Sequence, residues 1–137
     1  MKYMLMFISD DTNWDPSKPE TQEAYKRVGE WFEKHSTSGK IVGGEELKGT
    51  ATATTVRQRN GKITVTDGPY SESKESIGGY ALVDVQDLDE AIAMAKTWPV
   101  LSAIEIRPLV THDELASSME LDTAKEAQAA RTWKENA

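Results

Sequence analysis

The pair Asn60-Gly61 is the feature that most constrains the fold, because it lies between two short stretches of alternating apolar and polar residues. Both residues tolerate the positive φ angles of a type I′ turn. The pair therefore predicts a tight β-hairpin formed by strands over residues 54–59 and 62–66.

The two-residue turn also determines which residues share a face of the hairpin. The predicted opposite pairs are Arg59 with Lys62, Gln58 with Ile63, Arg57 with Thr64, and Val56 with Val65. One face then carries Val56, Ile63 and Val65, and Asp67 follows on that same face. The other face is polar and basic, with Arg57, Arg59, Lys62, Thr64 and Thr66.

Apolar periodicity and helix-end signals place the other elements around the hairpin. A central strand over 2–8 precedes a helix that has capping-box spacing from Ser17 to Glu20 and ends at Gly39. The later elements are a strand over 41–47 weakened or bulged by paired glycines, the hairpin, a strand over 79–85, a helix from Asp87 to Pro99, a strand over 102–109 and a helical tail from Thr111. This order predicts an α+β, ferredoxin-like split βαβ fold with an inserted β-hairpin and helices on one sheet face.

The other sheet face then lacks helical cover, and an open apolar face calls for a partner. Two such sheets packed face to face would form a dimeric α+β barrel, so we expect a homodimer. The alternative is a monomer in which the C-terminal helix covers that face. The tail is rich in alanine and poor in large apolar residues, which favours the dimer.

Composition narrows the classes of function. The 137 residues suit one domain, and the absence of cysteine excludes disulfides, thiolate nucleophiles and zinc ribbons. A net charge of −7 with scattered basic residues argues against direct nucleic-acid binding. No apolar run reaches membrane-spanning length, so we expect a cytoplasmic protein with no membrane partner.

A family resemblance rests on the segment after the hairpin. The residues that carry it are Asp67-Gly68-Pro69-Tyr70 with Glu72, Lys74 and Glu75, followed by Gly78-Gly79-Tyr80. They resemble the DGPF-domain branch of the YCII-related family over about residues 1–110, which leaves 111–137 as a C-terminal helical extension. The resemblance implies a dimeric ferredoxin-like barrel with a ligand cleft, in a mostly uncharacterised family. Some relatives are associated with sigma factors, others are small-molecule enzymes, and some use a His-Asp pair.

The two histidines do not fit that His-Asp pattern. His35 lies near the end of the first predicted helix, and His112 lies at the start of the tail. We interpret His35 as a helix-dipole or core-edge residue and His112 as an ordinary early helix residue. Their separation predicts no metal site, and no cofactor is expected.

Asp67 is the candidate catalytic residue. Its position on the apolar hairpin face predicts partial burial, which would raise its pKa and suit a general acid or base. The alternative is that its side chain accepts hydrogen bonds from nearby backbone amides and fixes the turn, which would lower its pKa.

The remaining candidates would bind a ligand beside Asp67. They are Glu45, Gly68, Pro69, Tyr70, Glu72 and Lys74. Lys74 would neutralise an anionic group, although a solvated pair with Glu72 or Glu75 is the ordinary role of such a lysine. The sequence therefore predicts a small-ligand protein with acid or base chemistry at Asp67. The alternative is a non-catalytic regulatory module linked to a sigma factor, with a protein partner at the C-terminal helix.

Overall fold

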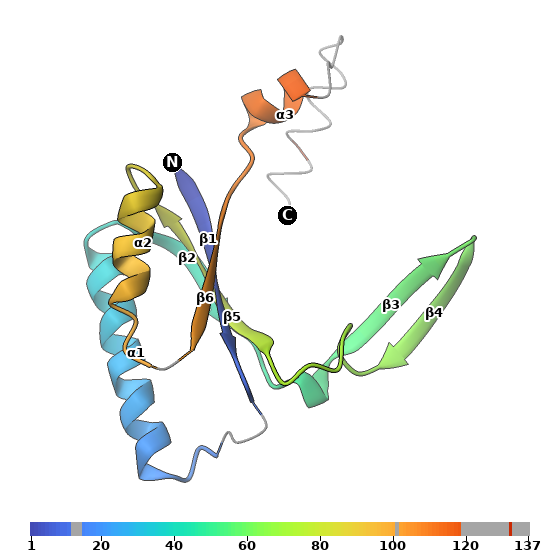
Figure 1. The fold of residues 1–137 in the computed structure, drawn as a ribbon, viewed down its shortest axis with the longest axis horizontal. Coiled ribbons are helices and arrows are strands. Elements are labelled where there is room, and N and C mark those ends of the chain that lie inside the picture. The colour runs from blue at the N-terminus through green and yellow to red at the C-terminus, as the bar shows by residue number, and fades with distance from the viewer. Residues whose placement is uncertain (12–14, 101, 119–131, 133–137) are drawn as a thin grey trace. The chain divides into compact units, whose positions relative to one another are not determined.

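The computed structural model describes residues 1–11, 15–100, 102–118 and 132 of the chain (Figure 1). The chain divides into two compact units, Met1–Arg107 and Pro108–Ala137. Within the described residues, no helix is both long enough and apolar enough to span a membrane.

A four-stranded sheet is the centre of the first unit. Its strands are β1 (Lys2–Ser9), β2 (Ile41–Glu46), β5 (Ser76–Asp84) and β6 (Ala103–Pro108). They lie in the order β2-β5-β1-β6, and β5 is antiparallel to both β1 and β2. This arrangement confirms the predicted ferredoxin-like α+β fold and the central position of the first strand.

The paired glycines of β2 produce the predicted irregularity. The register against β5 shifts between Ile41 and Gly43, so Val42 is the extra residue of a bulge. Gly44 has a φ of 148°, and a Cβ there would lie 2.5 Å from the carbonyl oxygen of Tyr80. Only glycine allows this close approach of the two strands.

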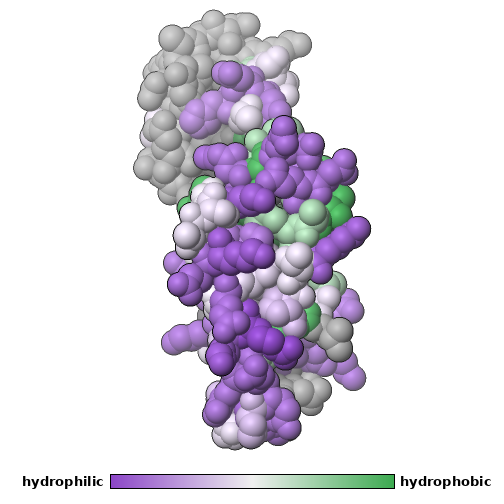
Figure 2. All heavy atoms as spheres, turned by 90° about the vertical axis from the view of Figure 1, so that its left-hand side faces the viewer, coloured by the Kyte–Doolittle hydropathy of each residue, from purple (hydrophilic) through white to green (hydrophobic). Residues whose placement is uncertain are grey.

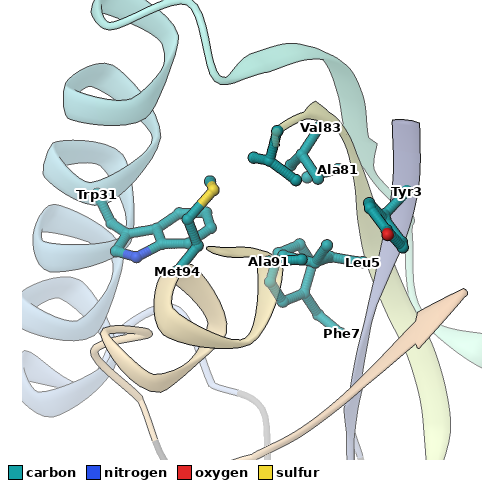
Figure 3. Close-up of a cluster of buried hydrophobic side chains, with 9 residues drawn as sticks. Tyr3, Leu5, Phe7, Trp31, Ala81, Val83, Ala91 and Met94 are labelled. Carbon is teal, nitrogen blue, oxygen red and sulfur yellow. The ribbon is translucent and has the colours of Figure 1, made fainter. Parts of the chain in front are cut away.

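Helices α1 (Pro19–Thr37) and α2 (Leu88–Lys96) cover the same face of the sheet (Figure 1). Alternate residues of the strands point toward these helices, as the close-up of the core shows (Figure 3). The buried core consists of Tyr3, Leu5, Phe7, Trp31, Ala81, Val83, Val85, Ala91 and Met94. The ring of Trp98 stacks on Phe7 with centroids 4.2 Å apart and extends the core toward the end of α2. The outer side of this layer is mostly hydrophilic (Figure 2).

The N-terminus of α1 corrects one sequence prediction. Lys18 occupies the N-cap position and no side chain caps it. The Ser17 hydroxyl and amide instead donate to the Asp15 carboxylate, at 2.6 and 2.9 Å. Ser17 therefore lies one residue before the N-cap, and its hydroxyl donates within this local turn and accepts from no helix amide of the described residues.

The described part of the second unit contains α3 (His112–Ser118). Its N-terminus is a true capping box, because the Glu114 amide donates to the Thr111 hydroxyl at 3.1 Å and the Thr111 amide donates to the Glu114 carboxylate at 2.9 Å. The helical tail predicted over 111–137 is thus seen in its first turns. Apart from residue 132, the rest lies outside the described residues.

Strands β3 (Thr54–Arg59) and β4 (Lys62–Asp67) form a separate two-stranded sheet. Asn60 and Gly61 have φ angles of 51° and 77°, as a type I′ turn requires. The register matches the prediction at all four pairs and extends to Thr54 opposite Asp67. A short 3-10 turn, η1 (Thr50–Thr52), precedes β3.

Candidate functional site

The loop that follows β4 is attached to the hairpin by strand β3. The Gly68 amide donates to the Ala53 carbonyl, and the Thr55 hydroxyl donates to the Gly68 carbonyl, both at 2.8 Å. Arg57 donates from Nη2 to the Tyr70 carbonyl at 2.8 Å, and its guanidinium lies 4.7 Å from the centroid of the Tyr70 ring. These contacts hold the loop backbone without using an acidic side chain.

Asp67 lies on the apolar side of the hairpin, as the register predicts. It is exposed, however, so the partial burial expected to raise its pKa is absent in the single chain. Its carboxylate makes no hydrogen bond or ion pair with any residue that the structure describes. The turn-fixing alternative is therefore also absent, because Thr55 and Arg57 hold the loop instead.

The other loop candidates lie beside Asp67 in sequence and differ in exposure. Gly68 and Pro69 are half-buried, while Tyr70, Glu72 and Lys74 are exposed. Tyr70 is anchored through its ring and carbonyl by Arg57, which leaves the hydroxyl in solvent. Among the described residues, Lys74 forms no ion pair with Glu72 or any other carboxylate.

Glu45 lies in the other sheet, on β2, directly opposite Tyr80 of β5. Because Ala81 and Val83 point into the core, their neighbours on β5 point away from the helices. The sheet face opposite α1 and α2 therefore carries Glu45 and Tyr80 beside apolar residues of β1 and β5. These apolar residues are Met4, Met6 and Leu82.

The structure does not join Glu45 to the Asp67 loop within one chain. Glu45 belongs to the four-stranded sheet and Asp67 to the hairpin. No hydrogen bond or ion pair connects the two within the described part of the chain. The single chain thus carries its candidate carboxylates on two separate surfaces.

Sequence reasoning missed a hollow between α2 and β6. It has a volume of about 400 Å³ and contains none of the predicted site residues. Its lining is Ile92, Ala95, Lys96, Trp98, Val100, Ser102, Ile104 and Ile106. Lys96 is the sole charged residue in that lining, so the hollow offers little for acid or base chemistry. The only sequence signal for it was the apolar periodicity of the two elements.

His35 is a core residue. Its ring packs edge-on against Trp31, with centroids 4.7 Å apart. Burial lowers its pKa, and the nearby Lys34 and Lys40 lower it further. The core-edge interpretation is confirmed.

His112, the other histidine, lies in the first turn of α3. Among the described residues, no three His, Asp or Glu side chains gather in a way that would hold a metal ion.

The strand order and the two helices on one face of the sheet define a small α+β protein of the ferredoxin-like class. The sequence profile of the YCII-related domain matches residues 1–112, and the chain belongs to this family. It is 30% identical over 119 residues to an uncharacterized protein of Rhizobium meliloti (strain 1021), covering 82% of this chain and 94% of that one. The assignment to the DGPF branch remains a prediction.

Proposed function

We propose that the protein is a cytoplasmic homodimer that binds a small anionic ligand at the loop after β4. In this proposal Asp67 accepts a hydrogen bond from the ligand and acts as acid or base where a proton is transferred. The observation that carries the proposal is the Asp67 carboxylate itself, which the loop does not use for its own structure. A carboxylate beside a glycine-containing loop, with no partner of its own, is suited to a ligand.

The neighbouring groups supply complementary chemistry. The Lys74 ammonium, which has no ion-pair partner in the described residues, would neutralise an anionic group of the ligand. The exposed Tyr70 hydroxyl would donate or accept a hydrogen bond, while Arg57 keeps its ring in place. Gly68 and Pro69 shape the backbone between them.

In this proposal, dimerisation shields the ligand and the sheet face beside it from water. An apolar strip on the sheet face opposite α1 and α2 consists of Met4, Met6 and Leu82, and a second copy packed there would bury it. Glu45 and Tyr80 would then lie at the interface, beside the ligand.

A second candidate function is a non-catalytic module that acts beside a sigma factor, with a contact through the C-terminal helix. One observation favours a protein-binding role, and it lies on the hairpin instead of the C-terminal helix. Three large apolar side chains of the hairpin, Val56, Ile63 and Val65, are exposed. This candidate needs no ligand at Asp67, so ligand binding separates the two.

Thermal stability in the presence of small organic carboxylates and phosphates tests the ligand proposal. Wild type, Asp67→Asn and Lys74→Gln would be compared at one protein concentration, because the midpoint of a dimer depends on concentration. The control is Glu33→Gln, which removes one charge from an exposed position on α1. We expect a compound that raises the midpoint of wild type and the control but not of the two loop variants. Equal shifts in all four proteins would place binding elsewhere and refute the proposed site.

A further inference from the structure

The hollow between α2 and β6 is built from one face of each element. On α2, Ala95 and Lys96 follow Ile92 by three and four residues, so all three share a face of the helix. On β6, Ile104 and Ile106 are two residues apart and share a face of the strand. The volume of about 400 Å³ lies within the range of roughly 300–1,000 Å³ that is typical of small-molecule pockets. The hollow is therefore large enough for a small ligand.

The apolar walls of the hollow remain partly accessible. On the same helix, Ala91 and Met94 are buried in the core. The apolar residues of the lining are instead only half-buried, namely Ile92, Ala95, Trp98, Val100, Ile104 and Ile106. Because removing apolar surface from water lowers the free energy, an apolar ligand that covered these walls would bind favourably.

Trp98 is held in the lining by contacts on two sides. Its ring stacks on Phe7 with centroids 4.2 Å apart, and its Nε1 donates to the Ser102 hydroxyl at 3.0 Å. Both contacts would be lost if the ring turned into the hollow. The hollow is therefore preformed at this wall, and a ligand does not have to displace the indole ring to enter.

The polar groups of the lining are suited to an anion. Lys96 is its sole charged residue, is exposed, and forms no ion pair with a carboxylate in the described part of the chain. The Ser102 hydroxyl accepts from Trp98, so its own hydrogen remains available to donate. The lining thus offers an ammonium and a hydroxyl donor, and it contains no acidic side chain. These two donors match one anionic group.

The end of α2 does not oppose an anion. A lysine in the last turn ordinarily complements the partial negative charge of the helix C-terminus, which would otherwise repel the ligand. The Met94 carbonyl accepts from the Thr97 amide at 3.1 Å and from the Thr97 hydroxyl at 2.7 Å. The Ala95 carbonyl accepts from the Trp98 amide at 3.1 Å. The full charge of Lys96 therefore outweighs the partial charge of carbonyls that already have donors.

We propose that the hollow binds an aliphatic monocarboxylate of medium chain length. The carboxylate lies against the Lys96 ammonium and the Ser102 hydroxyl, and the chain lies along the isoleucines of α2 and β6. The length follows from the volume. At the roughly 30 Å³ that a water molecule occupies in the liquid, the hollow accommodates on the order of a dozen non-hydrogen atoms.

A single polar end is also what the lining can satisfy. A peptide would bring several backbone amides and carbonyls into the hollow, and the lining side chains offer partners to few of them. A monocarboxylate brings one group for the two available donors. This site goes beyond the proposed function, because it contains no residue of the loop after β4.

An NMR titration of the full chain with octanoate measures both the position and the affinity of binding. We expect the amide shifts to concentrate in residues 92–100 and 102–106, which surround the hollow. Octanol has the same chain length without the charge. We expect its dissociation constant to be at least about fivefold higher than that of octanoate, because it cannot form an ion pair with Lys96.

A pair of lysine variants tests the assignment of the carboxylate. Lys96→Gln removes the charge of the lining, and Lys26→Gln removes a charge from an exposed position on α1. We expect Lys96→Gln to raise the dissociation constant of octanoate about fivefold and that of octanol less than about twofold. Lys26→Gln should change neither constant by more than about twofold.

A pair of alanine variants tests the position of the site. Ala95→Leu places a larger side chain inside the hollow, and Ala93→Leu places the same side chain at an exposed position of the same helix. Leucine is a good helix former, so α2 should persist in both. We expect Ala95→Leu to weaken the binding of both probes at least about tenfold, and Ala93→Leu to change it less than about twofold.

The outcomes that would overturn the inference differ from those that bear on the loop after β4. Failure of octanoate to bind wild type, or equal weakening by Ala95→Leu and Ala93→Leu, would overturn the site. An unchanged octanoate affinity in Lys96→Gln would overturn the carboxylate assignment, and this exposed substitution keeps the test decisive if Ala95→Leu does not fold. Shifts confined to residues 67–75 and weakened by Lys74→Gln would overturn the hollow while supporting the proposed loop site.

Discussion

The four-stranded sheet and the β3–β4 hairpin belong to one compact unit but differ in what stabilises them. In the sheet, Leu5 and Val83 are fully buried beneath α1 and α2. In the hairpin, Val56, Ile63 and Val65 are largely exposed, and the turn and cross-strand pairs supply the order. Apolar residues of the sheet therefore stabilise the fold by burial, whereas those of the hairpin gain little from contacts with the described residues.

The largest expected effect comes from truncating the sheet core. Leu5→Ala should lower the free energy of unfolding by about 2–5 kcal/mol, because it leaves a cavity at a fully buried site. Val65→Ala should cost less than about 1 kcal/mol in dilute protein, where the hairpin is exposed. Urea unfolding at low protein concentration measures both changes in the free energy of unfolding. A similar cost for the two substitutions would show that the hairpin is part of the core.

Glycine substitutions sharpen the same contrast. Gly44→Ala should destabilise the sheet by about 2 kcal/mol or more, because its Cβ would meet the Tyr80 carbonyl and the strands cannot separate freely. At the hairpin tip, a Cβ on Gly61 meets nothing within 4 Å, so Gly61→Ala should cost only about 1–2 kcal/mol from its positive φ. The same unfolding measurement applies. A milder effect at Gly44 than at Gly61 would contradict the close packing of β2 on β5.

The contrast also explains what the sequence could predict. The hairpin register depends on Asn60-Gly61 and on neighbours in the chain, and it was predicted pair by pair. Local signals also identified the bulge in β2 and the start of the helical tail at Thr111. The prediction at Ser17 was wrong because the N-cap falls one residue later, at Lys18, and the Ser17 hydroxyl donates to Asp15 in the turn before the helix.

The candidate site was less predictable because it depends on which surfaces meet. The face of Asp67 followed from the register, but its exposure depends on whether anything covers the hairpin. The sequence predicts Glu45 beside Asp67 because both are carboxylates suited to one ligand site. The sheet topology instead assigns them to different sheets. The hollow beside α2 arises where that helix meets β6, and sequence periodicity does not describe such long-range packing.

A change of pH should act on the core through His35. Its pKa is lowered in the folded state, so between the folded pKa and its usual value near 6.5 the unfolded chain binds the proton more tightly. His35 thus contributes stability that is present above about pH 6.5 and is lost as pH falls through the folded pKa. Uptake of one proton changes the free energy of unfolding by at most about 1.4 kcal/mol per pH unit.

Urea unfolding of wild type and His35→Leu between pH 7.5 and 5 measures this contribution, with those pH limits chosen to span about one unit or more on either side of the usual histidine pKa. We expect part of the wild-type pH dependence to disappear in His35→Leu, because the buried group can no longer take up a proton. His112→Gln removes the other histidine and serves as the control. An unchanged pH dependence in His35→Leu would show that protonation of the buried ring does not oppose folding.

The smallest expected effect concerns the contact between hairpin and loop. Arg57→Lys keeps the charge but loses the planar group that stacks on Tyr70 and donates to its carbonyl. Losing this contact should lower the stability of the loop by about 0.5–1 kcal/mol. Amide exchange in residues 68–75 should therefore become roughly two- to fivefold faster. Arg59→Lys is the control, since Arg59 lies on the same strand and face near the hairpin tip. Equal exchange in the two variants would mean that Arg57 does not hold the loop. Faster exchange in Arg57→Lys alone would show that the loop carrying the candidate site takes its order from β3, the same strand whose opposite face carries Val56.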